Sequence, residues 1–224
     1  MLLLLFLLIS SVFAHGGCSI EKKKLKGVFE PDNAGGMSGY IDFSYHKPNN
    51  SLHGMVSVNL DMTSVDYDAI YAEFPECDGL EKKFKWHLHS AWRNTEKSGF
   101  IEKCYPQVTS GHYDPTFACG PASQYKDDTV CIEINKQQSY NCNPENYKTD
   151  KIECEMGDFS GKYGELKIVD NKIVNVYHDD FFPQLSLFDK PMYNVDTVHW
   201  NVLLHLSCPA RGNPRVFCTR LELV

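Results

Sequence analysis

The sequence lacks a membrane-length hydrophobic run, an excess of basic residues and a helical apolar pattern. Each of these absences argues against one class of protein. Outside residues 1–14, no apolar segment approaches the roughly 20 residues needed to span a bilayer, so we expect no membrane span. The 22 Lys and Arg against 29 Asp and Glu give a net charge of -7, which disfavours nucleic acids and anionic membranes as partners. No window of helical length keeps a helical apolar period, which argues against an all-helical protein.

Zinc-finger cysteine spacing is also absent, although the chain contains nine cysteines. In an extracellular protein such a number predicts disulfides, and an odd total leaves one cysteine over. Cys119 with Cys154 and Cys131 with Cys142 would close the polar segment 119–154, which we expect to be a long surface loop. Other pairings fit the sequence as well, and three further cysteines stay open: Cys18, Cys77 and Cys208.

Residues 1–14 are typical of a secretory signal peptide, because an apolar run ends with Val12 and Ala14 at the positions that a signal peptidase prefers. Their removal would leave residues 15–224, the length of one domain with a full core. We therefore expect a secreted, extracellular protein with a single domain, and we favour a monomer. Asn49 lies in an Asn-X-Ser glycosylation sequon within a predicted turn.

Short segments of alternating or apolar β-forming residues dominate the rest of the chain. We predict strands at 39–45, 53–60, 84–89, 166–169, 173–177, 198–206 and 216–221. The turn residues at 47–50 and at 170–172 each predict a hairpin between the strands that flank them. The predicted fold class is all-β, an antiparallel Greek-key β-sandwich or flattened barrel with long disulfide-pinned loops.

Four histidines carry the strongest chemical signal. His87 and His89 are separated by one residue in a predicted strand, so both side chains lie on one face. His112 follows in the segment 110–115, and His205 ends the apolar run 202–204. Four imidazoles without a set of thiolates suit copper, zinc, iron or nickel. The sequence therefore predicts a metal site built from these side chains.

Six short motifs occur in a fixed order around these histidines. They are residues 39–43, the pair His87 and His89, and residues 111–115, 157–161, 203–205 and 213–218. With these motifs the chain resembles the copper/zinc superoxide dismutase superfamily, and more closely its extracellular copper-only branch. The resemblance covers most of residues 36–221. It implies a secreted copper-dependent superoxide dismutase on that family's β-sandwich.

The resemblance also implies a role for each site residue. It implies four copper ligands: His87, His89, His112 and His205. Arg215 would lie beside the metal and hold the superoxide anion. Arg211 is a second candidate for attracting the anion, because the segment that separates the last histidine ligand from Arg215 is short. Cys104 would form a disulfide with Cys218.

Residues 113–157 contain no histidine, whereas the copper/zinc enzymes carry zinc ligands in this part of the chain, so we expect no zinc. By resemblance, Glu155 would hydrogen-bond the far nitrogen of His112 and keep its ring in place. Asp158 would complete the acidic pair or fix the turn. The implied reaction converts superoxide to oxygen and hydrogen peroxide by alternating Cu(II) and Cu(I), with His112 supplying a proton. The expected partners are superoxide and a copper donor.

Two other functions are compatible with these residues. A secreted copper-binding or storage protein could use the same fold, although storage gives no role to Arg215. Cleavage after residue 14 would make His15 the N-terminus, where its amine and imidazole could form the copper brace of a monooxygenase. We assign no role to the other histidines, although alternation puts His199 on the face of His205: His46, His53, His178 and His199. We expect three residues to be packing residues: Trp86, Trp92 and Trp200.

Overall fold

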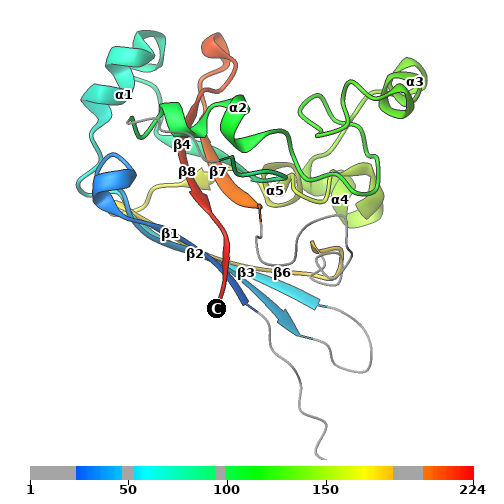
Figure 1. The fold of residues 1–224 in the computed structure, drawn as a ribbon, viewed down its shortest axis with the longest axis horizontal. Helices are drawn as coiled ribbons and strands as arrows, with labels where there is room; N and C mark the ends of the chain where they lie inside the picture. The colour runs from blue at the N-terminus through cyan, green and yellow to red at the C-terminus, as the bar shows by residue number, and fades with distance from the viewer. Residues whose placement is uncertain (1–23, 47–52, 94–98, 184–198) are drawn as a thin grey trace, which may run out of the picture.

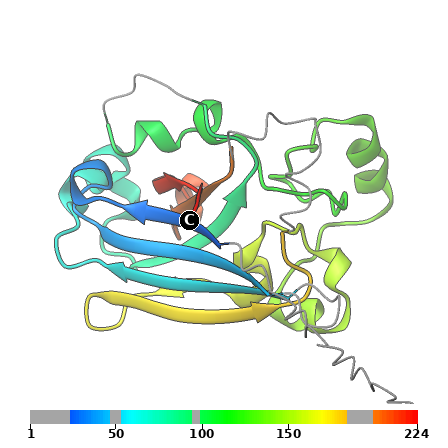
Figure 2. The ribbon, with the colours of Figure 1, turned by 60° about the horizontal axis from the view of Figure 1, so that its bottom comes forward.

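The protein is built from two antiparallel sheets packed around a common core. The structure, a computed structural model, describes residues 24–46, 53–93, 99–183 and 199–224. The first sheet has the strand order β6 (Lys172–Asp179), β3 (His53–Asp61), β2 (Ser38–His46), β1 (Lys24–Phe29) and β9 (Glu222–Leu223). The second has the order β5 (Leu166–Lys167), β4 (Lys83–His89), β7 (Asn201–Leu206) and β8 (Arg215–Arg220). Figure 1 shows both layers, and Figure 2 shows the first sheet with its strands side by side.

Alternation along the strands places one face of each sheet in the core and the other outside. The core side of β3 carries Val56, Val58 and Leu60. The core side of β4 carries Phe84, Trp86 and Leu88. The opposite side of β4 therefore carries Lys85, His87 and His89. On the neighbouring strand β7, His205 shares that outer side with Leu203, which clusters with Cys104 and Cys218 rather than with the main core.

The predicted antiparallel β-sandwich is confirmed. The flattened barrel is not found, because the two sheets stay separate within the described residues. The first hairpin is present, since β2 and β3 pair along their whole length. At the second predicted turn, Asp170 and Asn171 have φ angles of 50° and 59°, as a two-residue type I′ turn requires. The chain changes sheets at this turn, so the predicted strand 166–169 is reduced to β5.

Two strands were not predicted from the sequence: β1 and β9. They pair with each other, and β1 also pairs with β2. The first contains Lys24, Lys26 and Gly27 among six residues, and the second pairs through two residues only. Both are weak strand signals, because lysine and glycine are depleted in strands. The predicted strand 198–206 begins at Asn201 as β7, while residue 198 and Asn49 lie outside the described residues.

Short helices fill the connections between the strands in the described part of the chain. The α-helices are α1 (Tyr67–Glu73), α2 (Pro106–Thr109), α3 (Thr129–Gln137), α4 (Pro144–Thr149) and α5 (Phe159–Tyr163). The 3-10 helices are η1 (Pro31–Asn33), η3 (Pro75–Cys77), η4 (Glu102–Cys104), η5 (Lys151–Glu153) and η7 (Pro209–Arg211). None of these helices is long enough to develop an apolar stripe, which is why the sequence gives no helical period. Within the described residues, none could cross a membrane.

Four disulfides link the loops in the described residues: Cys77–Cys208, Cys104–Cys218, Cys119–Cys131 and Cys142–Cys154. The pairings expected for residues 119–154, Cys119 with Cys154 and Cys131 with Cys142, are wrong. This cysteine-rich segment folds back locally at α3 and α4, so each of its disulfides joins residues 12 apart in the sequence. The segment gathers at one end of the sandwich (Figures 1 and 2). The ninth cysteine, Cys18, lies outside the described residues.

Candidate metal centre

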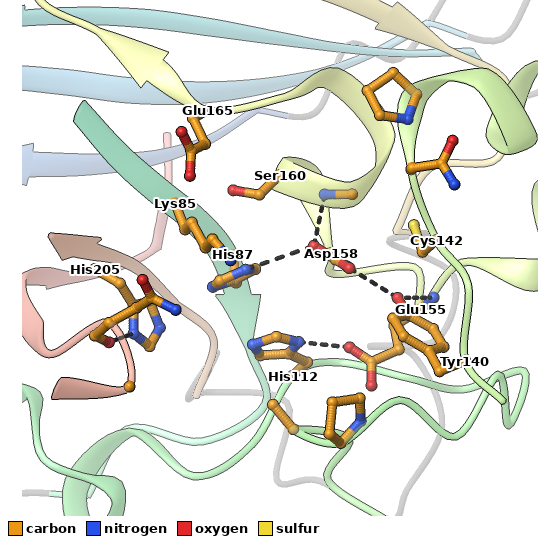
Figure 3. A pocket seen from close by; sticks show the side chains of 17 residues that line it. Lys85, His87, His112, Tyr140, Cys142, Glu155, Asp158, Ser160, Glu165 and His205 are labelled. Carbon is orange, nitrogen blue, oxygen red and sulfur yellow. Dashed lines mark hydrogen bonds and ion pairs between the residues drawn. The ribbon is translucent and has the colours of Figure 1, made fainter. Parts of the chain in front are cut away.

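The four histidines predicted as ligands come together on the outer face of the second sheet. His87 and His89 project from β4, and His205 on β7 pairs opposite Lys85. His112 follows α2 and pairs with His89 through an isolated β-bridge. One nitrogen from each ring lies within 4.8 Å of one nitrogen from every other ring. Figure 3 shows three of these rings beside one another.

In each ring, one nitrogen takes part in a contact outside the histidine cluster, and we call it the outer nitrogen. In two of the rings a backbone carbonyl holds this nitrogen. Nδ1 of His89 lies 2.9 Å from the carbonyl oxygen of Ser110, and Nδ1 of His205 lies 2.8 Å from that of Asn213. Because a carbonyl oxygen only accepts hydrogen bonds, both Nδ1 atoms carry the proton. The Nε2 atom of each ring is then the one with a lone pair for a metal.

A carboxylate lies beside each of the other two rings. Nδ1 of His112 lies 2.5 Å from Oε2 of Glu155, and Nε2 of His87 lies 3.5 Å from Oδ1 of Asp158. Figure 3 draws both contacts. Glu155 therefore contacts the histidine that the resemblance implies, while Asp158 contacts a different one. Acceptors on the outer nitrogens of metal-binding histidines fix the rings and raise their basicity.

The nitrogens that face inward are buried and have no hydrogen-bond partner among the described residues. They are Nδ1 of His87, Nε2 of His89 and Nε2 of His205. An unpaired buried polar atom costs about 1–3 kcal/mol. Three such atoms side by side, each with a lone pair, fit a metal ion that all of them can ligate. The chemistry of these side chains therefore fits a metal ion bound by imidazoles.

Burial keeps three of the rings in the neutral form that binds metals. It lowers the pKa of His87 and of His89 well below the ordinary value, and it lowers the pKa of His205 to about 3. His112 differs from them. Burial opposes its charge too, but the carboxylate of Glu155 raises the pKa of His112 overall.

Arg215 brings a fixed positive charge to the histidines from the start of β8. Its Nη1 donates hydrogen bonds to Oγ1 of Thr109 at 2.5 Å and to the carbonyl oxygen of Ser110 at 3.1 Å. Burial lowers the pKa of Arg215 to about 10, so the guanidinium is charged at neutral pH. Since Ser110 also accepts from His89, the positive charge of Arg215 lies next to one of the four histidines.

The remaining candidates lie elsewhere. Arg211, in η7, forms an ion pair with Glu76 at the surface, with 3.5 Å between Nε and Oε2. His53 and His178 are exposed strand residues, and the four-histidine group does not include His199. His15 and the side chain of His46 lie outside the described residues. The tryptophans pack as expected, two in the main core and one on the Cys104–Cys218 disulfide: Trp86, Trp200 and Trp92.

Tyr140 and Thr109 hold site residues in place and were not predicted from the sequence. Tyr140 belongs to the cysteine-rich segment, where no motif marks it, and its hydroxyl group lies between Asp158 and Glu155. It also lines a cavity of about 460 Å³ beside the histidines. Glu155, Asp158 and Lys85 also line this cavity (Figure 3).

The four imidazoles can hold a metal ion, as their mutual distances and burial show. Neither a scan against protein-family models nor a search of curated proteins finds a match for this chain. The interpretation of the site therefore depends on its own chemistry: the donor set, the partners of the outer nitrogens and the neighbouring guanidinium.

Proposed function

We propose that this protein is a secreted, copper-dependent superoxide dismutase that works without zinc. The proposal rests on two features that occur together. Three buried imidazole nitrogens have no hydrogen-bond partner, and the guanidinium of Arg215 lies nearby, because it donates to the same carbonyl oxygen as His89. Imidazole ligands suit both oxidation states of copper. The outer nitrogen of His112 is taken by Glu155, which supports a single-metal site.

Copper held by the four histidines would supply one-electron chemistry, taking an electron from one superoxide, released as oxygen, and passing it with two protons to another, released as hydrogen peroxide. The chain's own contribution begins with Arg215. Its positive charge attracts the anion, and its hydrogen bonds to Thr109 and Ser110 fix the direction in which the guanidinium points. A cavity of about 460 Å³ reaches three of the four histidines, His87, His112 and His205, but Arg215 is not among its lining residues.

His112 and Glu155 handle the proton in this proposal. The carboxylate raises the pKa of His112, so its ring can carry a second proton, on Nε2, and deliver it to the developing peroxide. The Nδ1 contact to Glu155 keeps the ring in place during the proton transfer, and solvent supplies the second proton of the peroxide. Storage of copper would need neither this proton path nor Arg215.

The test is to express the full chain in a secreting host, load it with copper, and measure metal content and superoxide removal together. We expect about one copper ion per chain, as a single four-imidazole site predicts, and little zinc. His89→Ala should lose copper. Arg215→Ala should keep copper and lose most of the superoxide removal. His178→Ala, which changes an exposed histidine on β6, is the control and should behave like the wild type.

Two outcomes would overturn the proposal. Stoichiometric copper with no superoxide removal would identify a copper-binding or storage protein instead. Copper that survives His89→Ala but is lost in His15→Ala would identify an N-terminal copper brace.

A further inference from the structure

We propose that the hydroxyl group of Tyr140 positions the two carboxylates of the metal centre, Glu155 and Asp158. Through them it fixes the orientation of two histidine ligands, His112 and His87. This inference deepens the proposed function and rests on it for its meaning. It also gives the cysteine-rich segment a role, since that segment supplies Tyr140.

The hydroxyl group of Tyr140 uses both of its hydrogen-bonding capacities on the acidic pair. It donates to Oδ2 of Asp158 at 2.8 Å and accepts the backbone N–H of Glu155 at 3.1 Å. The other oxygen of Asp158, Oδ1, is held by the N–H of Gly161 at 2.8 Å and lies 3.5 Å from His87. Figure 3 draws these contacts as dashed lines, and the side chain of Glu155 links them to the contact with His112.

The two histidines at the ends of these contacts lie against each other. The ring centroids of His87 and His112 are 4.0 Å apart, and the ring planes differ by 24°. For both rings to direct a nitrogen at the same metal ion, their outer nitrogens must be held in a fixed position relative to one another. The outer contacts go to Asp158 and Glu155, so the spacing of these two carboxylates sets the spacing of the rings.

Burial makes the hydroxyl group important for that spacing. Glu155 is completely buried and Asp158 nearly so, and two carboxylates so close repel each other in a medium of low dielectric constant. A donor that contacts one carboxylate while anchoring the backbone of the other holds both in place. Burial raises the pKa of Tyr140 far above its usual range, so the hydroxyl group keeps its proton and remains a donor.

The cysteine-rich segment also packs closely on the carboxylate of Glu155 through Gly120. A Cβ atom at Gly120 would lie 2.4 Å from Oε1 of Glu155 and 3.0 Å from Cε1 of Tyr140, so a larger residue there would push the Glu155 carboxylate out of its position. The disulfide Cys142–Cys154 joins the residue two places after Tyr140 to the residue just before Glu155. The segment is thus crosslinked at the point where it delivers the tyrosine.

The test compares Tyr140→Phe with Tyr147→Phe. Each change removes one hydroxyl group that donates to a carboxylate, but Tyr147 donates to Asp179, which makes no contact with the four histidines among the described residues. The readouts are the copper affinity by chelator competition, the Cu(II) electron paramagnetic resonance spectrum, and the imidazole N–H signal of His112 in the metal-free protein by NMR. Thermal unfolding of both variants measures the purely structural cost.

For Tyr140→Phe we expect copper affinity to fall about tenfold, the lower end for partners of metal-binding histidines. The Cu(II) spectrum should change, and the N–H signal of His112 should broaden because Glu155 is less firmly held. Tyr147→Phe should lower the unfolding temperature and leave the affinity and both spectra unchanged. Wild-type affinity and spectra in Tyr140→Phe would overturn the inference.

The two proposals fail separately. A wild-type protein that neither binds copper nor removes superoxide would refute the proposed function, while the His112 signal of the metal-free protein would still decide the role of Tyr140. If Tyr140→Phe does not fold, 3-fluorotyrosine at position 140 changes the strength of the hydroxyl group as a donor without removing it. A shifted His112 signal there, absent from the same replacement at position 147, supports the inference, and an unshifted signal overturns it.

Discussion

His89 and Arg215 share one hydrogen-bond acceptor, the carbonyl oxygen of Ser110, which lies 2.9 Å from Nδ1 of the histidine and 3.1 Å from Nη1 of the arginine. A ligand of the proposed metal and the cation proposed to bind the substrate are therefore aligned by the same atom. Ser110 reaches this position with φ 63° and ψ -153°, a backbone region that is essentially restricted to glycine. The sharing of the acceptor is thus achieved at the cost of local backbone strain.

Ser110→Gly should stabilise the protein. The strained conformation costs a serine about 1–3 kcal/mol, and glycine adopts it without that cost while losing about 0.5–1 kcal/mol of chain entropy. The net gain should be about 1 kcal/mol in the free energy of unfolding, measured by urea denaturation of the metal-free protein. Ser57→Gly, in the regular strand β3, is the matched control and should destabilise. A loss of stability in both variants would show that Ser110 stores no strain.

The Cys104–Cys218 disulfide should affect activity as well as stability. Cys104 lies directly before the segment that carries Thr109, and Cys218 lies on the strand that begins with Arg215. Replacing both cysteines by alanine should cost about 2–5 kcal/mol of stability and also lower superoxide removal per bound copper, because the arginine loses a fixed support.

The matched control for that change is the removal of Cys77–Cys208, which links η3 to η7. Its loss should lower stability by a similar amount and leave the rate per bound copper unchanged. Unfolding curves and stopped-flow superoxide decay on the copper-loaded variants give both quantities. Equal loss of rate in the two variants would contradict the prediction.

The buried ion pair of Lys162 and Asp179 predicts a pH dependence in the alkaline range. The lysine is fully buried, donates to the carbonyl oxygens of Met156 and Phe181, and lies 3.3 Å from the carboxylate. Burial lowers the pKa of Lys162 to about 8, whereas an unfolded chain keeps the ordinary value of 10.5. Between these values the unfolded state binds the extra proton, so this group makes the folded state more stable as the pH rises.

The measurement is the difference in unfolding free energy between the wild type and Lys162→Met at pH 7, 8, 9 and 10. Above pH 8 we expect the unfolding free energy of the wild type to rise relative to that of the variant by about 1.4 kcal/mol per pH unit. Between pH 7 and pH 8 we expect little change in this difference. The comparison cancels the ionisation of the tyrosines, which both proteins share. A difference that does not change with pH would mean that the lysine has an ordinary pKa.

Metal removal should destabilise the protein in proportion to the affinity of the site. Copper at 100 times its Kd should add about 2.7 kcal/mol to the free energy of unfolding, and a chelator should abolish that gain. His205→Ala should remove the copper effect, and His178→Ala should retain it. Thermal unfolding with copper and with chelator distinguishes the two. Equal copper stabilisation of both variants would place the metal at another site.

The sequence predicts the parts of the molecule that follow from local periodicity. Alternation along β4 places His87 and His89 on one face because the opposite residues form the core. The pairing within the cysteine-rich segment was not predictable in this way, because it depends on how α3 and α4 turn the chain back. Tyr140 was missed for the same reason: its partners are distant in sequence, and a tyrosine in a polar segment has no distinctive pattern.

The separation of the ligands along the chain has a consequence for biogenesis. His87 and His89 are contributed by a strand near the middle of the sequence, and His205 by one near its end, which pair only when the second sheet closes. Contacts of such long sequence separation form late in folding. A chain that ends before His205 would therefore hold at most three of the four histidines, so we expect the complete site to form only in the folded product.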